Sequence, residues 1–509
     1  MENQGMLAGD GDEFPCPQPW NELAGGIELI PFPPSKQQDG LSDQPAANEA
    51  QSETSTLLEN HETEETVEIL QPPASPAALS VEDLIRMASL KFIQSHSKDM
   101  PFDVAAASVH SPLSEEQSAS VELAELLLEA VERVGDRRFD GARTLLQQCD
   151  RRCSPTGSPI QRLVFYYSRS LRNRIDRETG QTGLGDTVKA KEQSSNLFKV
   201  IMTPSVRSVE FQRRLPFSQV AQFAGIQTIL EHVEGARRIH VLDLAIRNGH
   251  QWTILMQALA TRRRIRVEHL KITAVATMGK ELIEQTGRRL VMFAQTMSLV
   301  CSFDVVMVRD LAELRQDHLR FDSGVTVVVL ADYVASTLTS PAERLDALIK
   351  TIRRVKPCVM VVMEMEGSRN SPVFVNRFVE SLFFAGVLFD CMGDCMVGDE
   401  ATRKYGEETL LGEVSKIVMM GAADDDDGAG GGEGREWMIR SLKVDVWRAY
   451  FRRFGMVETQ LSRSSMYQAE LVAERVPCWS PCTVWMDGKS LIVGWKGTPV
   501  KSITAWKFS

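Results

Sequence analysis

No part of the chain contains the run of about 18 apolar residues that a membrane-spanning helix requires. A secretory signal is also missing, so the nine cysteines predict reduced thiols in the cytosol or nucleus. Zinc sites usually combine closer cysteine pairs with histidines, and the eight histidines lie away from the cysteines. We therefore expect no metal from the three equally spaced pairs Cys149/Cys153, Cys391/Cys395 and Cys478/Cys482.

Strong basic charge is absent as well. Residues 1–80 carry fifteen acids and one base, Lys36, for a net charge of −14, which leaves +3 for residues 81–509. The densest basic run, TRRRIR at Thr261–Arg266, is short. A nearly neutral body lacks the field that attracts nucleic acid, so we expect DNA association to be indirect, through a partner. A direct, sequence-specific DNA-binding factor stays open as an alternative.

Composition divides the chain into segments. Residues 1–79 are acidic and rich in Pro, Gln and Ser, which predicts a disordered tail that is either a partner-binding segment or a solvating linker. Residues 80–118 form a short helix, capped by Ser80, and a linker. Residues 119–235 predict a helical cap, and 236–509 an α/β core interrupted by a flexible acidic loop at 421–434, whose adjacent aspartates do not suit a calcium site.

The cap shows apolar stripes at helical spacing. Val121, Leu127, Val131 and Val134, with Leu126 and Ala130, mark one helix. Ala142, Leu145 and Leu146 mark the next, and 160–175 a third. Short helices with short connections indicate a helical bundle rather than a coiled coil.

Strand-like and helix-like runs alternate after residue 239, which predicts a doubly wound α/β sheet. The expected helices are 280–298, 341–354 and 372–388. Two strands, Leu491–Trp495 and Ser502–Trp506, surround a Gly-Thr-Pro turn and predict a C-terminal hairpin that adds an edge to the sheet. The other expected strands are 239–244, 270–276, 304–308, 325–330 and 359–363.

The stretch Ile239–Leu259 reads as a buried strand, a turn after Asp243, and a helix whose apolar stripe includes Trp252. A dinucleotide or S-adenosylmethionine site would need small residues in this turn, so that backbone N–H groups can approach the ligand. Ala245, Ile246 and Arg247 occupy it instead, and only Gly249 remains. The pattern predicts a nucleotide-binding architecture whose cofactor site is closed.

An enzyme remains the rival hypothesis. Asp243, Asp310, Asp332 and Glu364 follow predicted strands, where doubly wound folds bind their ligands. Against it, the second strand ends in Ala-Val-Ala without an acid for ribose hydroxyls. Under the alternative interpretation these acids are solvated or cap helices.

Aromatic side chains around the same turn have a structural interpretation. A histidine on a strand, such as His240, is more often hydrogen-bonded in the core than a ligand. His250 flanks the turn on its other side. We expect Trp252, Trp495 and Trp506 to be core anchors whose indole N–H groups find partners.

Several of these motifs resemble the plant GRAS family of transcriptional regulators. Its VHIID motif resembles IHVLD in this chain, which comprises Ile239, His240, Val241, Leu242 and Asp243. The usual continuation of that motif is matched by Gly249, Gln251, Trp252 and LMQAL. LLLEAV at 126–131, SPTG at 154–157 and QRL at 161–163 resemble its first leucine-rich region.

The C-terminal half continues the resemblance. Residues 374–390 resemble the helix of the PFYRE region and include Arg377, Phe378 and Glu380. Arg377 and Glu380 have the (i, i+3) spacing at which side chains on a helix can pair. GW at Trp495 and TAW at Trp506 resemble the SAW motif. The motifs follow in order over 121–509. Two stretches depart from the usual pattern, ADYVAS at 331–336 and IVMMGA at 417–422, and the N-terminus lacks a convincing DELLA signature.

The resemblance implies a Rossmann-like, methyltransferase-like core with an α-helical cap, and a nuclear, non-enzymatic regulator without cofactor or small-molecule substrate. Its implied partners are other transcription factors, including GRAS proteins as homo- or heterodimers. The implied partner-binding residues lie in the first leucine-rich region: Leu126, Leu127, Val131, Leu145 and Leu146. An S-adenosylmethionine-dependent methyltransferase is the remaining alternative.

Overall fold

The computed structural model describes residues 79–96, 113–181, 210–211, 213–339, 342–368, 371, 373–419, 441–475 and 481–509, and every statement below concerns these. The chain divides into residues 1–78 and 79–509, and only the second unit is described. The predicted tail, apart from residue 79, and the predicted loop at 421–434 therefore lie outside the described residues.

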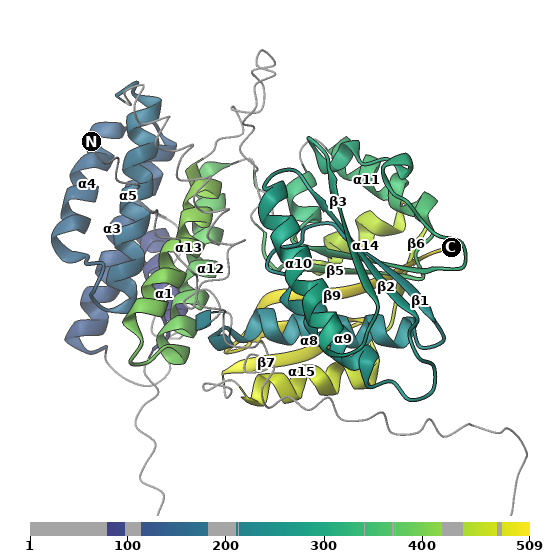
Figure 1. The fold of residues 1–509 in the computed structure, drawn as a ribbon. Coiled ribbons are helices and arrows are strands. Elements are labelled where there is room, and N and C mark those ends of the chain that lie inside the picture. Colours follow the sequence, from purple (N-terminus) through teal and green to yellow (C-terminus); the bar gives the residue numbers. More distant parts are fainter. Residues whose placement is uncertain are drawn as a thin grey trace, which may run out of the picture. The chain divides into compact units, whose positions relative to one another are not determined.

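One mixed sheet forms the centre of the described unit, in the order β3-β2-β1-β4-β5-β9-β8-β7, with β6 also pairing to β9 (Figure 1). Strands β1 to β5 are parallel, and β9 joins β5 antiparallel. The chain winds outward from β1 to β3 and then returns to β4 on the other side of β1. This arrangement confirms the predicted doubly wound fold class. The strands are β1 (Arg238–Asp243), β2 (His269–Ala276), β3 (Cys301–Met307), β4 (Thr326–Asp332), β5 (Val359–Met365), β6 (Met456–Thr459), β7 (Cys482–Asp487), β8 (Ser490–Trp495) and β9 (Thr498–Phe508).

Helices cover both faces of this sheet, as buried parallel strands require. One layer contains α8 (Pro216–His232), α9 (His250–Ala260), α10 (Lys280–Thr296) and α15 (Arg463–Arg475), which pack on one another or on the strands. Beneath the other face, α11 (Ala342–Val355) and α14 (Val444–Arg452) share an apolar cluster that includes Leu242, Trp447 and Trp506. The short turns η2 (Leu311–Glu313), η3 (Gln316–His318) and η4 (Ala335–Leu338) adjoin α11. The sheet and these helices are called the core below.

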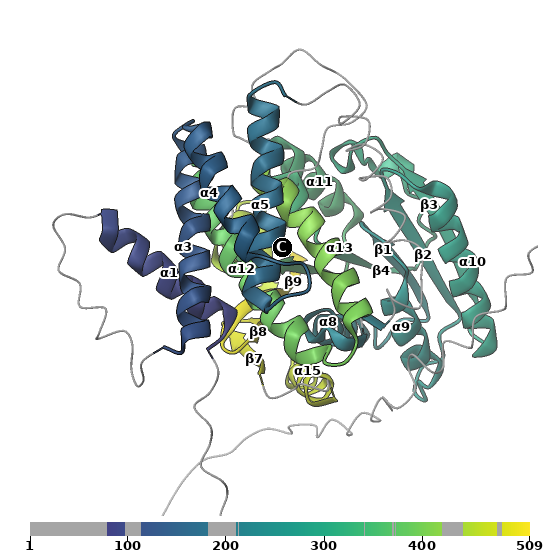
Figure 2. The same cartoon turned by 90° about the vertical axis from the view of Figure 1, so that its left-hand side faces the viewer.

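The remaining helices form a bundle, called the cap, from two distant parts of the chain (Figure 2). The helices α1 and α3 pack against α12, and α5 packs against both α12 and α13. The cap helices are α1 (Val81–His96), α3 (Glu115–Gly135), α4 (Phe139–Arg152), α5 (Pro159–Glu178), α12 (Phe374–Cys395) and α13 (Glu400–Met419).

The packing of the helices cuts across the predicted segments. The short helix predicted at the start of residues 80–118, α1, packs with the cap, α8 packs on the core, and α12 and α13 pack with the cap although they follow β5. Periodicity finds such helices but not the partner of their apolar faces, since a cap and a sheet bury the same kind of stripe.

Side-chain caps explain where the cap helices begin. Ser114 and Gln117 form a reciprocal capping box at α3, and Ser158 and Gln161 form one at α5. At α1, Ser80 Oγ accepts from the backbone of Asp83 (3.0 Å), as the sequence predicted. Asp390 of α12 accepts from the N–H of Val81 (2.9 Å), which fixes the start of α1 on the rest of the cap.

The interior of the cap contains three of the five predicted partner-binding residues. Leu127, Val131 and Leu146 are 0% exposed, because α3, α4 and α5 pack their apolar stripes against one another. Leu126 and Leu145 are half-buried. The first three residues therefore stabilise the cap, and partner binding by the five residues stays a prediction.

The C-terminal hairpin is present, but its position differs from the prediction. β9 lies between β5 on one side and β8 and β6 on the other, so it is a central strand and not an edge. Trp506, 0% exposed, reaches the apolar cluster under the sheet. The end of the chain is thus built into the middle of the fold.

Candidate functional site

The candidate site is the place where a doubly wound sheet binds ligands, the crevice beyond the carboxyl ends of β1 and β4. These strands are neighbours, and the chain leaves them in opposite directions across the sheet. Asp243 ends β1 and Asp332 ends β4. The residues beyond these two strand ends determine whether the crevice is open.

Asp243 is 1% exposed and is held by hydrogen bonds from its own chain. Its Oδ1 accepts from the N–H of Ala245 (3.0 Å), and its Oδ2 accepts from Trp252 Nε1 (2.7 Å) and Gln251 Nε2 (3.2 Å). Burial raises the pKa of Asp243 to about 6, although the bonds from Ala245 and Trp252 favour the ionised form. This carboxylate ties the turn to α9 and is not solvated.

The turn after β1 depends on Gly249. Its φ is +75°, and a Cβ at this position would lie 2.9 Å from Leu290 and 3.0 Å from Thr286 on α10. Only glycine takes that backbone conformation at such close approach. The glycine therefore lets α9 begin against α10, while Ile246, 4% exposed, fills the preceding turn.

Three side chains contact one another beyond these strand ends. Arg247, from the turn after β1, places its guanidinium 4.7 Å from the ring centre of Tyr333, which follows β4. Lys501 of β9 places Nζ 4.1 Å from the same ring and 2.9 Å from Asp332 Oδ1. Tyr333 has a positive φ of 57°, which is strained for a non-glycine residue, so these contacts hold an unfavourable backbone in place.

The other predicted acids are also engaged. Glu364, 2% exposed, accepts from the N–H groups of Ala335 (2.7 Å) and Ser336 (3.3 Å) at the start of η4, and burial raises its pKa to about 7. Asp310 caps η2 by accepting from Ala312 N (2.9 Å), and its Oδ2 accepts from Arg344 (2.7 Å). All four acids at the strand ends thus have protein partners.

The histidines follow the structural interpretation. His240 is 1% exposed, its Nε2 lies 2.8 Å from Thr273 Oγ1, and burial lowers its pKa to about 4. This confirms a hydrogen-bonded core histidine. Burial likewise lowers the pKa of His250 to about 4 at the start of α9.

Two of the three tryptophan predictions are confirmed. Trp252 donates to Asp243, and Trp506 Nε1 donates to Thr504 Oγ1 (2.8 Å). Trp495 is 1% exposed and packs edge-on against Phe217, but its indole nitrogen has no hydrogen-bond partner within the described residues. Its role as an anchor is therefore apolar.

The PFYRE-like helix α12 contributes to the cap rather than to the crevice. Phe378 is 0% exposed and meets Tyr167 of α5 edge-on, with ring centres 5.2 Å apart. Arg377 is buried and donates to the carbonyl of Ser371 (2.7 Å), while Glu380 is exposed. The pairing of Arg377 with Glu380 stays a prediction.

Metal and membrane sites do not emerge from the described part of the chain. No group of three His, Cys, Asp or Glu side chains there is arranged to hold a metal ion. Cys391 and Cys395 lie with Sγ atoms 3.9 Å apart on α12, and Cys478 lies outside the described residues. None of the described helices is both long and apolar enough to cross a membrane.

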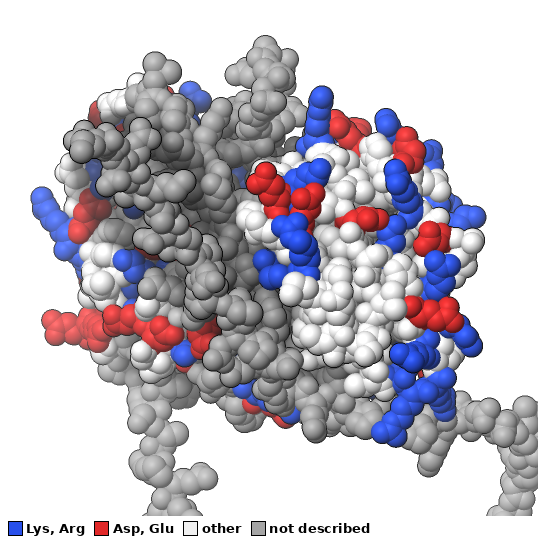
Figure 3. Space-filling model, viewed as in Figure 1, with Lys and Arg blue, Asp and Glu red and all other residues white. Residues whose placement is uncertain are grey.

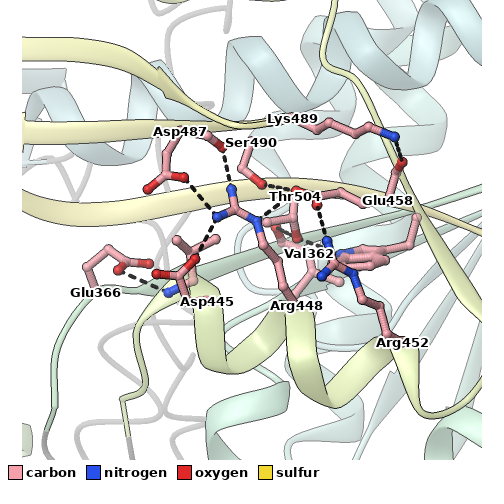
Figure 4. A network of polar contacts seen from close by, with 12 residues as sticks. Val362, Glu366, Asp445, Arg448, Arg452, Glu458, Asp487, Lys489, Ser490 and Thr504 are labelled. Carbon is pink, nitrogen blue, oxygen red and sulfur yellow. Dashed lines mark hydrogen bonds and ion pairs between the residues drawn. The ribbon is translucent and has the colours of Figure 1, made fainter.

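A second polar cluster surrounds Arg448 of α14 (Figure 4). Arg448 Nη1 donates to Asp445 and Asp487 (2.8 Å each), and its Nε donates to Glu458 (3.1 Å). An open hollow of about 510 Å³ lies beside it, lined also by Arg452 and Lys489. Because these charges pair with one another, the cluster serves to fix the turn between β7 and β8 on α14.

A model of the GRAS domain family matches residues 123–507. The chain belongs to the GRAS domain family. This GRAS chain is 28% identical to Scarecrow-like protein 23 of Arabidopsis thaliana over 402 residues, which cover 78% of the chain and 92% of the relative. It is 24% identical to the DELLA protein GAI1 of Vitis vinifera over 402 residues, 78% of the chain and 63% of that relative.

Among solved structures, the crystal structure of SCL7 in Oryza sativa matches with a TM-score of 0.56 at 21% identity, covering 84% of this chain and 99% of that one. This likeness supports the fold. The predicted membership among plant transcriptional regulators is confirmed by the family match and the plant relatives.

Sequence reasoning missed Tyr333 and Lys501. Tyr333 lies in the ADYVAS stretch that departs from the usual family pattern, so the departure itself was the available signal. Lys501 is the cation in the buried stretch 500–506 of β9, 1% exposed, and such a lysine needs a carboxylate partner. That partner, Asp332, comes from a strand 169 residues earlier and was not identifiable by spacing.

Proposed function

We propose that this GRAS protein is a nuclear, non-enzymatic co-regulator that binds other transcription factors, including GRAS proteins, and reaches DNA through them. The observation that carries the proposal is the set of contacts that the protein's own side chains make beyond β1 and β4. Arg247, Tyr333 and Lys501 lie where a nucleotide-binding fold would admit its ligand, and Asp243 is bonded to the protein itself. A fold that keeps the architecture but fills the site is suited to binding through its surfaces.

Partner binding is proposed for the exposed side of the cap. Of the five leucine-rich-region residues predicted, Leu126 and Leu145 remain partly accessible, and Ile93 of α1 is 56% exposed. Deleting the region would unfold the cap, because its helices share a core with α12 and α13. Point substitutions at the surface are therefore the informative test.

The test compares capture of transcription factors from nuclear extract, identified by mass spectrometry, by three forms of the full chain. We expect wild type to capture them, and the double variant Leu126→Glu, Leu145→Glu to lose them while melting like wild type. Val457→Glu, on an exposed strand residue of the core, is the control and should capture normally. Undiminished capture by the double variant would overturn the assignment of this surface, and capture of no transcription factor by any form would overturn the co-regulator function.

Direct DNA binding is the second candidate, favoured by one feature. Arg263, Arg264 and Arg266 are exposed in the loop after α9, where Figure 3 shows basic side chains gathered. Nearby Arg237 and Arg238 are paired with Glu268 and Asp322. Fluorescence anisotropy with duplex DNA, in wild type and in a variant with the three arginines replaced by alanine, tests this candidate. Tight, sequence-selective binding that the variant loses would establish it.

A further inference from the structure

Two arginines of the cap approach one buried carboxylate. Arg162 of α5 and Glu407 of α13 are 2% and 1% exposed, and Arg162 Nε donates to Glu407 Oε1 (2.8 Å). Arg403 lies one helical turn before Glu407, and its Nε is 3.9 Å from the same Oε1, which is an ion pair but too long for a hydrogen bond. The helices α5 and α13 pack on each other within the cap (Figure 2). The cluster therefore brings two positive charges to one negative charge.

Each of the two guanidinium groups has an N–H donor without an acceptor. Arg162 Nη1 donates to the carbonyl of Gly157 (2.7 Å), but Arg162 Nη2 and Arg403 Nε have no hydrogen-bond partner among the described residues. The Nε and Nη2 donors of an arginine point along the same edge, from which a carboxylate can accept both. Glu407 accepts only from Nε of Arg162. The two unsatisfied donors thus lie beside the same carboxylate oxygen.

The surroundings make this imbalance of charge unfavourable. The guanidinium of Arg162 lies 5.8 Å from the ring centre of Phe389 on α12, and burial lowers its pKa although Glu407 is adjacent. Burial also raises the pKa of Glu407, which disfavours the one negative charge. A buried donor without an acceptor costs free energy, so two of them at one place indicate a ligand that supplies acceptor oxygens and negative charge.

From this geometry we propose that Arg162 and Arg403 bind a phosphate group beside Glu407, either as free phosphate or as a phosphate monoester. One phosphate oxygen accepts from Arg162 Nη2 and another from Arg403 Nε, because a phosphate group can accept several charge-assisted hydrogen bonds at once. The side chain of Arg403 is 20% exposed, so the site is reached from solvent along α13. This site belongs to the cap, and it does not depend on the proposed function.

Isothermal titration calorimetry of the full chain with inorganic phosphate, compared with chloride at equal ionic strength, tests the site. We expect saturable binding with a Kd of about 1 mM or lower, and Arg403→Met should weaken it at least about tenfold by removing a charged donor. Lys404→Met is the matched control and should bind like wild type. Lys404 also lies 3.9 Å from a glutamate four residues on, Glu408, but its side chain is 65% exposed.

Glu407→Gln distinguishes a phosphate site from an ion pair that only stabilises the cap. Its amide oxygen can still accept from Arg162, while the negative charge that competes with phosphate is removed. We therefore expect Glu407→Gln to bind inorganic phosphate at least about tenfold more tightly than wild type. A purely structural pair predicts a loss of thermal stability with no gain in phosphate affinity, which would overturn the proposal.

Titration with N-acetyl-phosphoserine amide distinguishes the two sources of the phosphate group. Binding as tight as that of inorganic phosphate identifies a site for a phosphorylated chain, whereas binding of inorganic phosphate alone identifies an enclosed site for the ion. Absence of saturable binding of either probe by the wild type overturns the proposal, because the unsatisfied donors would then hold only water. Equal phosphate affinity of Arg403→Met and Lys404→Met would overturn it as well.

Discussion

The indole N–H of Trp252 donates to Oδ2 of Asp243 over 2.7 Å, which joins the end of β1 to the first turn of α9. In a nucleotide-binding fold this edge faces a ligand. Here the carboxylate of Asp243 accepts hydrogen bonds from α9 and fixes that helix to β1. The acid of the IHVLD motif therefore has a structural explanation. The predictions below examine this explanation one contact at a time.

Replacing Asp243 should destabilise the protein without any ligand being involved. Asp243→Ala leaves the indole, the Ala245 N–H and the Gln251 amide without their acceptor, which we expect to cost about 3 kcal/mol of unfolding free energy. Urea denaturation measures it. Asp322→Asn, at a side chain 53% exposed, is the control and should change stability by no more than about 0.5 kcal/mol. Equal stability of both variants would contradict this role.

Glu364 should make stability depend on pH in a defined direction. Its pKa is raised to about 7 from an ordinary 4.5, so the folded state binds its proton more tightly than the unfolded state. Its contribution is therefore complete below pH 4.5 and is lost as pH rises through 7. Relative to Glu364→Gln, wild type should lose stability over this range, with a slope approaching about 1.4 kcal/mol per pH unit. Parallel pH curves for the two proteins would show that the carboxyl is not perturbed by burial.

Gly249 should tolerate no side chain. Gly249→Ala combines a left-handed backbone with a Cβ less than 3 Å from Leu290, and we expect a loss of about 3 kcal/mol. Gly497 has a similar φ, +85°, with nothing within 4 Å, so Gly497→Ala should cost only about 1 kcal/mol. Thermal melts of both variants separate the steric contribution from the backbone contribution. A milder effect at Gly249 than at Gly497 would refute the close packing of α9 on α10.

Lys501 and Asp332 should behave as a coupled pair. Lys501→Ala leaves a carboxylate that is only 15% exposed without its cation, and we expect a loss of about 3–5 kcal/mol. The double variant Lys501→Met, Asp332→Asn should recover much of that loss, since neither charge remains unpaired. A double-mutant cycle by chemical denaturation measures the coupling. Strictly additive losses would mean that the two side chains do not interact.

Much of the core was predictable because its signals are local. The strand before Asp243 and the stripe of α9 show the required periods, and His240 followed the usual behaviour of strand histidines. The assembly of the cap was not predictable, because α12 joins α3 and α5 across more than 190 residues. The contact between Tyr333 and Lys501 was not predictable for the same reason, because it joins residues from distant parts of the sequence.

Isothermal titration calorimetry with S-adenosylmethionine tests the central claim most directly. The account predicts no saturable heat with the wild-type chain, because Arg247 and Lys501 contact the ring of Tyr333 beyond the ends of β1 and β4. Arg247→Gly, which opens the turn, is measured beside it to show whether that side chain blocks a latent site. Saturable micromolar binding by the wild type would contradict the closed site and restore the enzyme hypothesis.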